Sequence, residues 1–199
     1  MLNVRTRQTY LKELGFYKGN IDGIEGKLTR EAYKGLQSKY FTRAKDIDGI
    51  YGKNTDTLLQ SAYNCKDSRY FNLKEFKCKC GGKYCTGYPA IVNRDLVVYL
   101  NDLRSKYGKS ITITSGLRCS KWNSIQGGAI LSRHKSGKAA DILMNNYYNL
   151  ACRQSIINTW IIDYANSRYA YCNGYFRNKS KSGYISVPSM GTSTHVDVN

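Results

Sequence analysis

A heptapeptide occurs twice near the start of this chain, as IDGIEGK at residues 21–27 and as IDGIYGK at residues 47–53. Each copy contains an Asp-Gly pair, which favours a turn because the aspartate side chain can bond nearby backbone and glycine adopts positive φ freely. Three segments with helical chemistry surround the two turns: residues 4–14, 28–40 and 54–63. Turns repeated between helices predict that residues 1–65 form a compact three-helix unit.

The first turn lies inside a longer motif, LGFYxGxIDGxxGxxT, which resembles the small peptidoglycan-binding domain found at the ends of many wall hydrolases. Its fixed positions are filled by Leu14, Gly15, Phe16, Tyr17, Gly19, Ile21, Asp22, Gly23, Gly26 and Thr29. The resemblance implies binding to the glycan or to the stem peptide of peptidoglycan. Asp-Gly turns also join helices in unrelated small bundles, and the repeated heptapeptide is what favours the peptidoglycan-binding domain.

Cysteine and lysine become frequent after Cys65, in the stretch KDSRYFNLKEFKCKCGGKYC. We interpret this stretch as a linker and the beginning of a second domain, so the expected domains are residues 1–65 and 66–199. Two helices and two strands are predicted in the second domain, at residues 91–107, 148–166, 111–114 and 194–198. Helices followed by short strands indicate an α+β fold with a small antiparallel sheet.

The chain has only two histidines, His134 and His195, and both lie in polar contexts where a core histidine would be unusual. Asp141 follows His134 closely. Two imidazoles and one carboxylate form a three-ligand set for catalytic zinc, which leaves the fourth position for water. On spacing alone, solvated surface histidines remain the alternative.

A longer motif runs through the first histidine, as Ser132-x-His134-x-x-Gly137-x-Ala139-x-Asp141. It resembles the signature of the zinc peptidases that act as D-alanyl-D-alanine carboxypeptidases and L-alanyl-D-glutamate endopeptidases, relatives of the hedgehog fold and of the vancomycin-resistance dipeptidases. Three further strings match the same family: Glu75-Phe76-x-Cys78-x-Cys80, Thr114-Ser115-Gly116-x-Arg118-Cys119 and His195-Val196-Asp197. The resemblance implies that the zinc ligands are His134, Asp141 and His195. It also implies that Arg118 and Ser132 contact the substrate. Arg118 would bind a carboxylate of the substrate or the carbonyl of the peptide bond being cut.

The sequence does not identify the general base directly. Branches of the family place a carboxylate three residues before the last zinc histidine, where this chain has Thr192. Residues two apart in a strand share a face, so Asp197 projects on the same side as His195. Asp197 is therefore the candidate catalytic residue, either as proton acceptor or as the partner that orients the imidazole. Glu75 and Asp163 are the next carboxylates to consider.

Seven cysteines, an odd number, leave at least one outside any intramolecular disulfide. Cys78, Cys80, Cys85 and Cys119 could form a structural zinc site or pairs of disulfides, although C-x-C-x4-C is not the spacing of a common zinc knuckle. In either state we expect them to stabilise the start of the second domain against the end of the strand before Cys119.

The 31 Lys and Arg residues against 14 Asp and Glu residues give a formal net charge of +17, which favours a polyanionic partner. The basic residues are scattered and no nucleic-acid-binding motif accompanies them, so an anionic cell wall is favoured over nucleic acid. No segment reaches the roughly 18 apolar residues that span a bilayer. The first residues also lack a signal-peptide pattern, so we expect synthesis in the cytoplasm and no membrane insertion.

These features together predict a monomeric, zinc-dependent peptidoglycan hydrolase of the bacteriophage endolysin kind. It would cut an amide bond in the peptide part of the bacterial cell wall after release by a holin. A host autolysin from a prophage-like locus is the near alternative. A wall-binding or phage structural protein with a degenerate peptidase domain is the alternative from another class, favoured only by Thr192. The sequence leaves open which peptide bond is cut.

Overall fold

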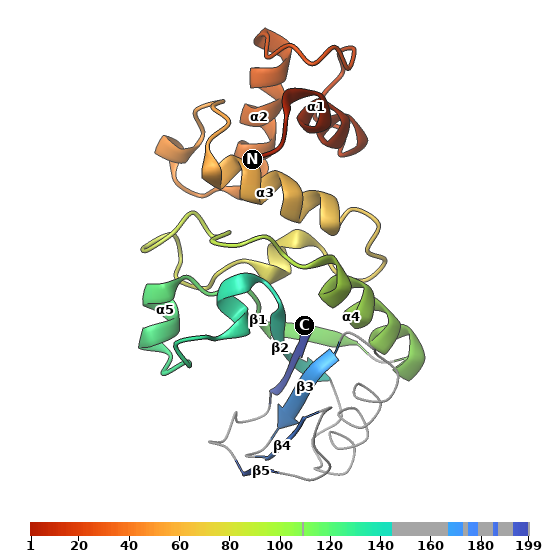
Figure 1. Cartoon of the computed structure of the whole chain (residues 1–199), viewed down its shortest axis with the longest axis vertical. Helices are drawn as coiled ribbons and strands as arrows, with labels where there is room; N and C mark the ends of the chain where they lie inside the picture. Colours follow the sequence, from red (N-terminus) through yellow and green to blue (C-terminus); the bar gives the residue numbers. More distant parts are fainter. Residues whose placement is uncertain (109, 145–166, 173–174, 179–184, 187–192, 199) are drawn as a thin grey trace.

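The computed structural model describes residues 1–108, 110–144, 167–172, 175–178, 185–186 and 193–198. Within these residues the chain has the predicted α+β fold, with helices in its first part and an antiparallel sheet at the opposite end (Figure 1). Among the helices of this part of the chain, none has the length and apolar character needed to cross a membrane. The helix predicted over residues 148–166 lies outside the described residues.

Three helices form the N-terminal unit, as predicted. They are α1 (Val4–Glu13), α2 (Lys27–Tyr40) and α3 (Lys53–Asn64), with a short 3₁₀ helix η1 (Ala44–Asp46) between the last two. Helix α1 begins where the Asn3 side chain accepts a hydrogen bond from Thr6 N–H. Leu11, Tyr33 and Leu58, one from each helix, are fully buried. Helices of this length are marginal alone, so this shared core is what stabilises them.

Each repeat closes on a buried glutamine from the preceding helix. Gln8 Nε2 donates to Asp22 Oδ1 (2.7 Å), and its Oε1 accepts from the N–H of the following glycine (2.8 Å). Gln37 makes the same pair of contacts with Asp48 (2.9 Å) and with the glycine after it (2.8 Å). Both glutamines are buried, so each turn is held from inside the helical unit. The structural repeat therefore extends beyond the heptapeptide.

The described residues of the second half form helices and six strands. Its elements are η2 (Leu73–Phe76), α4 (Arg94–Tyr107), β1 (Ile111–Ser115), α5 (Ser120–Ile125), η3 (Arg133–Ser136), β2 (Ala139–Met144), β3 (Ser167–Cys172), β4 (Tyr175–Asn178), β5 (Ile185–Ser186) and β6 (Thr194–Val198). The predicted strands at residues 111–114 and 194–198 are present as β1 and β6. The helix predicted from residue 91 begins at Arg94, because the Asn93 side chain caps it by accepting from the N–H groups of Asp95 and Leu96.

The strands form one antiparallel sheet in the order β1-β2-β6-β3-β4-β5. The last strand in the sequence, β6, thus lies inside the sheet, between β2 and β3. Its apolar residues Val196 and Val198 are buried, and helix α4 contacts this strand. This arrangement fixes the position of the C-terminal histidine within the core of the second half.

The segment before α4 joins the two halves. Val92 N–H donates to Ser61 Oγ (3.0 Å), and Asn64 Nδ2 donates to Val92 O (2.8 Å). Farther along the junction, Arg43 Nη1 donates to Gly82 O (3.3 Å). The buried apolar side chains form one cluster that continues from the helical unit into the second half. We propose a domain boundary near residue 65, with the two domains packed against each other.

Candidate metal centre

Strand register brings two of the three predicted metal ligands together. Asp141 on β2 and His195 on β6 are direct cross-strand partners, although they are 54 residues apart in the sequence. His134 comes from η3, which precedes β2 and contacts it. The three residues are only 2–4% exposed. Ionisable side chains are buried to this degree only when other polar groups or a metal compensate them.

Gly137 lets the chain turn from η3 into β2. Its φ is 72°, in the left-handed region that glycine adopts at no steric cost. A Cβ at this position would lie 1.9 Å from Ile91 O. The Gly137 carbonyl accepts a hydrogen bond from Asn93 N–H (2.9 Å), which ties the turn to the start of α4. The glycine of the motif is therefore a packing requirement that places His134 beside β2.

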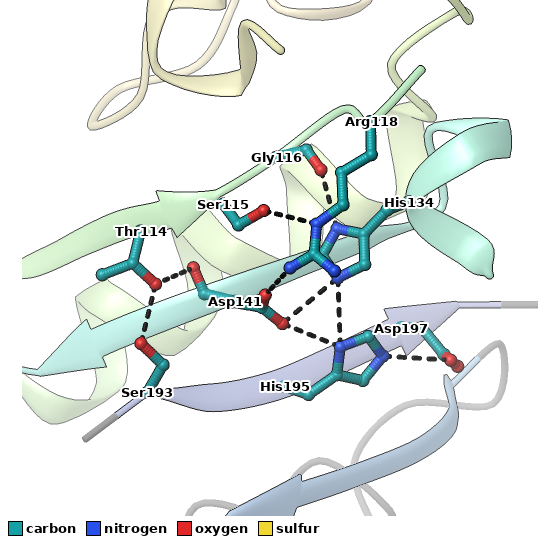
Figure 2. Close-up of polar contacts among 9 residues, drawn as sticks. All are labelled: Thr114, Ser115, Gly116, Arg118, His134, Asp141, Ser193, His195 and Asp197. Atoms are coloured by element: carbon teal, nitrogen blue, oxygen red, sulfur yellow. Dashed lines mark hydrogen bonds and ion pairs between the residues drawn. The ribbon is translucent and has the colours of Figure 1, made fainter. Parts of the chain in front are cut away.

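Three nitrogen and oxygen atoms converge at the centre (Figure 2). His134 Nε2 lies 3.2 Å from Asp141 Oδ1 and 3.3 Å from His195 Nδ1, and His195 Nδ1 lies 2.9 Å from Asp141 Oδ1. In a tetrahedral zinc site with bonds of about 2.0–2.1 Å, the ligand atoms are about 3.3 Å from one another. The triangle of ligand atoms therefore fits a zinc ion.

Contacts on the outer edges of the rings orient both imidazoles. His134 Nδ1 lies 2.7 Å from Gly116 O, and His195 Nε2 lies 3.4 Å from Asp197 Oδ2. Because both oxygens accept hydrogen bonds, these two ring nitrogens are assigned the protons, and the other nitrogen of each ring directs a lone pair to the centre. Asp141 Oδ1 is an acceptor too. Three acceptors that face one another repel unless a cation lies between them, which is the arrangement of a metal site with its outer partners.

The pKa shifts favour the metal-binding protonation states of Asp141 and His134, whereas His195 must lose a proton before it binds a metal. Burial opposes ionisation of Asp141, but the hydrogen bonds with His134 and His195 outweigh burial and lower the pKa of this carboxyl. Burial lowers the pKa of His134, which favours its neutral form. Burial also acts to lower the pKa of His195, but the hydrogen bonds with Asp141 and Asp197 prevail and raise it. An ionised Asp141 beside a neutral His134 is the form in which these side chains coordinate a metal.

Arg118 holds the oxygen of Asp141 that faces away from the histidines. Its Nη2 donates to Asp141 Oδ2, and its Nε donates to Ser115 Oγ (2.8 Å). On the backbone side, Thr114 Oγ1 donates to Asp141 O (3.0 Å) and lies 2.8 Å from Ser193 Oγ. Asp141 is thus fixed through its side chain and its backbone, and Oδ1 remains directed at the two imidazoles.

Two family models match this chain. A model for a peptidoglycan binding domain matches residues 2–59, and the Peptidase M15 model matches residues 69–170, just over half of the chain. The chain belongs to the peptidase M15 family. The M15 match contains Arg118, His134 and Asp141 and ends before His195. No curated protein matches the chain.

Family membership confirms the predicted fusion of a peptidoglycan-binding domain with a peptidase of this type. The M15 peptidases are typically zinc-dependent, and this chain has a candidate set of metal ligands. Together the two matches support a peptidase that acts at the cell wall, with peptidoglycan as its partner.

The structure gathers most of the predicted site residues and adds some that the sequence analysis did not assign. Arg118 and Asp197 both touch the ligand set. Ser132 lies at the start of η3, and its hydrogen bonds with described residues involve only its backbone. Its N–H donates to Ala129 O, and its carbonyl accepts from Lys135 N–H. Glu75 accepts from Asn72 N–H (2.9 Å) and so caps η2. The other two positions considered, Asp163 and Thr192, lie outside the described residues.

Three neighbours of the ligands had no assigned role in the sequence analysis. Gly116 orients His134 through its carbonyl, Ser115 holds Arg118, and Thr114 holds the Asp141 backbone. All three stand in the TSGxR string that resembles the family. The match of this string to the family was the only sequence signal for these three residues. The residue types alone do not predict that a backbone carbonyl and two hydroxyl groups would hold the ligands and Arg118.

Proposed function

We propose that this protein is a zinc-dependent hydrolase that cuts an amide bond in the peptide part of bacterial peptidoglycan. The observation that carries the proposal is the convergence of His134 Nε2, Asp141 Oδ1 and His195 Nδ1 within 2.9–3.3 Å of one another in a chain of the M15 family. When bound, zinc supplies Lewis acidity, which lowers the pKa of water and polarises a carbonyl oxygen. A set of three protein ligands, which leaves one coordination position open, is typical of catalytic zinc sites.

Arg118 is the proposed substrate-orienting residue. Its Nε and Nη2 are engaged with Ser115 and Asp141, while Nη1 makes no hydrogen bond with the described residues. We propose that Nη1 donates to a substrate carboxylate or to the carbonyl of the bond being cut. Because the guanidinium is already fixed by two contacts, it binds substrate with little further loss of conformational entropy. Ser132, at the start of η3, is the second proposed substrate contact.

Asp197 is proposed to orient His195 and not to accept the proton of the attacking water. Its Oδ2 lies beside Nε2, whereas Nδ1 on the opposite edge of the ring faces the other two ligands. Asp197 is fully buried, and its Oδ1 has no hydrogen-bond partner within the described part of the chain. A proton acceptor must reach the water directly or through one water, and this carboxylate is separated from the centre by the imidazole. The general base is therefore left unassigned.

The N-terminal domain is proposed to hold the enzyme at the wall. A groove of about 350 Å³ is lined by residues of both repeats and of helix α2 between them: Glu25, Gly26, Lys27, Arg30, Glu31, Lys34, Asp48 and Gly49. Charged groups of both signs in one groove suit the carboxylates, amines and amides of a stem peptide. We propose this groove as the wall contact, with the charge of +17 adding a nonspecific attraction to the anionic wall.

The catalytic proposal is tested on purified peptidoglycan, with released peptides identified by mass spectrometry. We expect peptide release that a chelator abolishes and added zinc restores, and that His195→Ala eliminates. The masses also identify the bond that is cut. Release that survives both the chelator and His195→Ala would refute the proposal. A folded, zinc-loaded protein that binds walls but releases nothing would favour the non-catalytic wall-binding alternative.

The wall-targeting proposal is tested with fragments. Residues 1–65 should bind walls by themselves, and less strongly as salt screens the charge. Residues 66–199 should retain activity on small soluble peptides and lose it on intact walls. Because the halves share buried apolar side chains, circular dichroism must first establish that each fragment is folded. Equal activity on walls with and without residues 1–65 would remove the targeting role. We further propose that the biological role is wall lysis of the endolysin kind.

A further inference from the structure

A second cluster of metal-ligating side chains lies away from the histidines. The Sγ atoms of Cys78, Cys80, Cys85 and Cys119 all lie within 4.8 Å of one another. Three of the four residues are buried and Cys85 is partly buried. None of the four is in a disulfide with another described cysteine. The sequence analysis left their state open between a metal site and disulfides.

The backbone folds so as to bring the sulfurs together. Cys78 N–H donates to Gly87 O (2.8 Å), and Lys83 N–H donates to Cys80 O (3.1 Å), which closes the loop between Cys80 and Cys85. Cys119 comes from a later part of the sequence, after β1 and at the N-cap of α5. The four ligands thus come from a tight loop and from one distant residue.

Backbone N–H groups point at two of the sulfurs. Cys119 N–H donates to Cys78 Sγ (3.4 Å), and Gly87 N–H donates to Cys85 Sγ (3.4 Å). Hydrogen bonds from outer donors to a ligand atom are the usual support of a metal-bound thiolate.

The geometry distinguishes a metal site from disulfides. A disulfide requires two sulfurs about 2.0 Å apart, and it does not require the sulfurs of a second disulfide to lie near them. In a tetrahedral zinc site with Zn–S bonds of about 2.3 Å, each sulfur is about 3.8 Å from the other three. The distance from Cys80 Sγ to Cys85 Sγ is 3.5 Å, and all four sulfurs are mutual neighbours within 4.8 Å.

Nearby positive charge offsets the charge of such a site. Zinc with four thiolates carries two negative charges, which are costly to bury unless cations lie close by. The Lys77 ammonium, and the Arg43 guanidinium that also pairs with Asp46, lie near enough to the sulfurs of Cys80 and Cys85 to interact with them electrostatically. Lys77 also lies against Gly87, at the rim of the cluster.

We propose that Cys78, Cys80, Cys85 and Cys119 bind a second zinc ion in a closed tetrathiolate site. Four protein ligands leave no open position, so this zinc is structural and takes no part in hydrolysis. It joins the first loop of the catalytic domain to the N-terminus of α5. Cys119 directly follows Arg118, which holds Asp141, and Gly82 in the loop accepts a hydrogen bond from Arg43 of the helical unit. The site therefore supports the position of Arg118 and the junction between the two domains.

The test uses the full-length wild-type protein, purified without chelators. Elemental analysis should find two zinc ions per chain. A thiol-specific mercurial reagent should release one of them in step with the loss of four thiols. Exchange with cobalt should give the intense sulfur-to-cobalt absorption of a tetrathiolate centre, which a site with two histidines and one aspartate cannot produce.

Variants separate the two sites. His195→Ala should lose one zinc and keep the sulfur-to-cobalt absorption, whereas Cys80→Ser should lose that absorption. Cys65→Ser is the matched control, since Cys65 is a buried thiol outside the cluster, and it should keep both zinc ions. These outcomes do not depend on whether the protein hydrolyses peptidoglycan.

Three results would overturn the proposal. The first is a single zinc per wild-type chain that mercurial treatment does not release. The second is protection of the four cysteines from alkylation until a reductant is added, which would show two disulfides. The third is two zinc ions per chain in a folded Cys80→Ser protein without change in the cobalt spectrum.

Discussion

Replacing Asp197 by asparagine separates the two roles open to this carboxylate. Asp197 is fully buried, and its Oδ2 lies 3.4 Å from His195 Nε2. The substitution keeps the size of the side chain but removes the charge that holds the imidazole. Loss of an outer partner typically weakens metal affinity by about 10 to 100-fold, or roughly 1.4–2.7 kcal/mol. Because 3.4 Å is long for a hydrogen bond, we expect an effect near the lower limit of that range.

The assay combines two measurements on the same preparation. A competition titration against a chromogenic chelator gives the zinc affinity, and hydrolysis of a soluble wall peptide at saturating zinc gives the turnover number. We expect Asp197→Asn to bind zinc more weakly and to recover turnover close to that of the parent once zinc is in excess. Asp67→Asn is the control, because the Asp67 side chain is 72% exposed and, among the described residues, forms an ion pair with Lys66 alone, so neither quantity should change.

Two results would contradict the orienting role. A variant with parental zinc affinity and turnover reduced by about 10² to 10⁴ would identify Asp197 as the general base. A variant with both quantities unchanged would remove Asp197 from the mechanism altogether.

Three further predictions concern the fold around the site and the wall-binding unit. Burial opposes ionisation of Asp56, but its hydrogen bonds, the one from Tyr51 first, outweigh burial and lower the pKa of this carboxyl below the ordinary 3.8. Ionised Asp56 therefore stabilises the fold above pH 3.8, and this stability is lost as the pH falls through the lowered pKa. Asp56→Asn should weaken the acid dependence of urea unfolding below pH 3.8, and an unaltered pH profile would contradict the assignment. Gln37→Ala leaves buried partners unsatisfied and should reduce the free energy of unfolding by about 1–3 kcal/mol, whereas the exposed Gln126→Ala should not. Gly137→Ala should reduce both thermal stability and zinc affinity, since its Cβ would overlap a backbone oxygen; parental values of both would show that the turn can relax.

The helical half was predictable because its signals are local. Asp-Gly turns and helical periodicity are read within a few residues, and the predicted helices differ from α1 and α2 by one residue at one end and from α3 by one residue at each end. The glutamines that close the turns were not predictable. Gln8 lies 14 residues before its aspartate partner and Gln37 lies 11 residues before its own, so the two copies of this contact do not share one sequence spacing.

The sheet was harder to predict because strand pairing is not local. Strands β1 and β6 were identified by their β-branched and alternating residues, but β2 was not, since its first three residues belong to the motif that ends at Asp141 and its apolar part is only three residues long. The family resemblance supplied the three ligand candidates without saying how they meet. Their meeting depends on the register of β2 with β6, in which Asp141 stands opposite His195, and no local pattern encodes a register across 54 residues.

This dependence on register couples the metal centre to the folding of the second half. Without a metal, the hydrogen bond between His195 and Asp141, which raises the pKa of His195, joins β6 to β2. With a cation, the same three atoms attract it and join η3, β2 and β6. The tetrathiolate site that we propose lies on the opposite side of Asp141, because Cys119 directly follows Arg118 in the chain and Arg118 holds the second carboxylate oxygen. Asp141 is thus the residue through which loss of either zinc should weaken the other site.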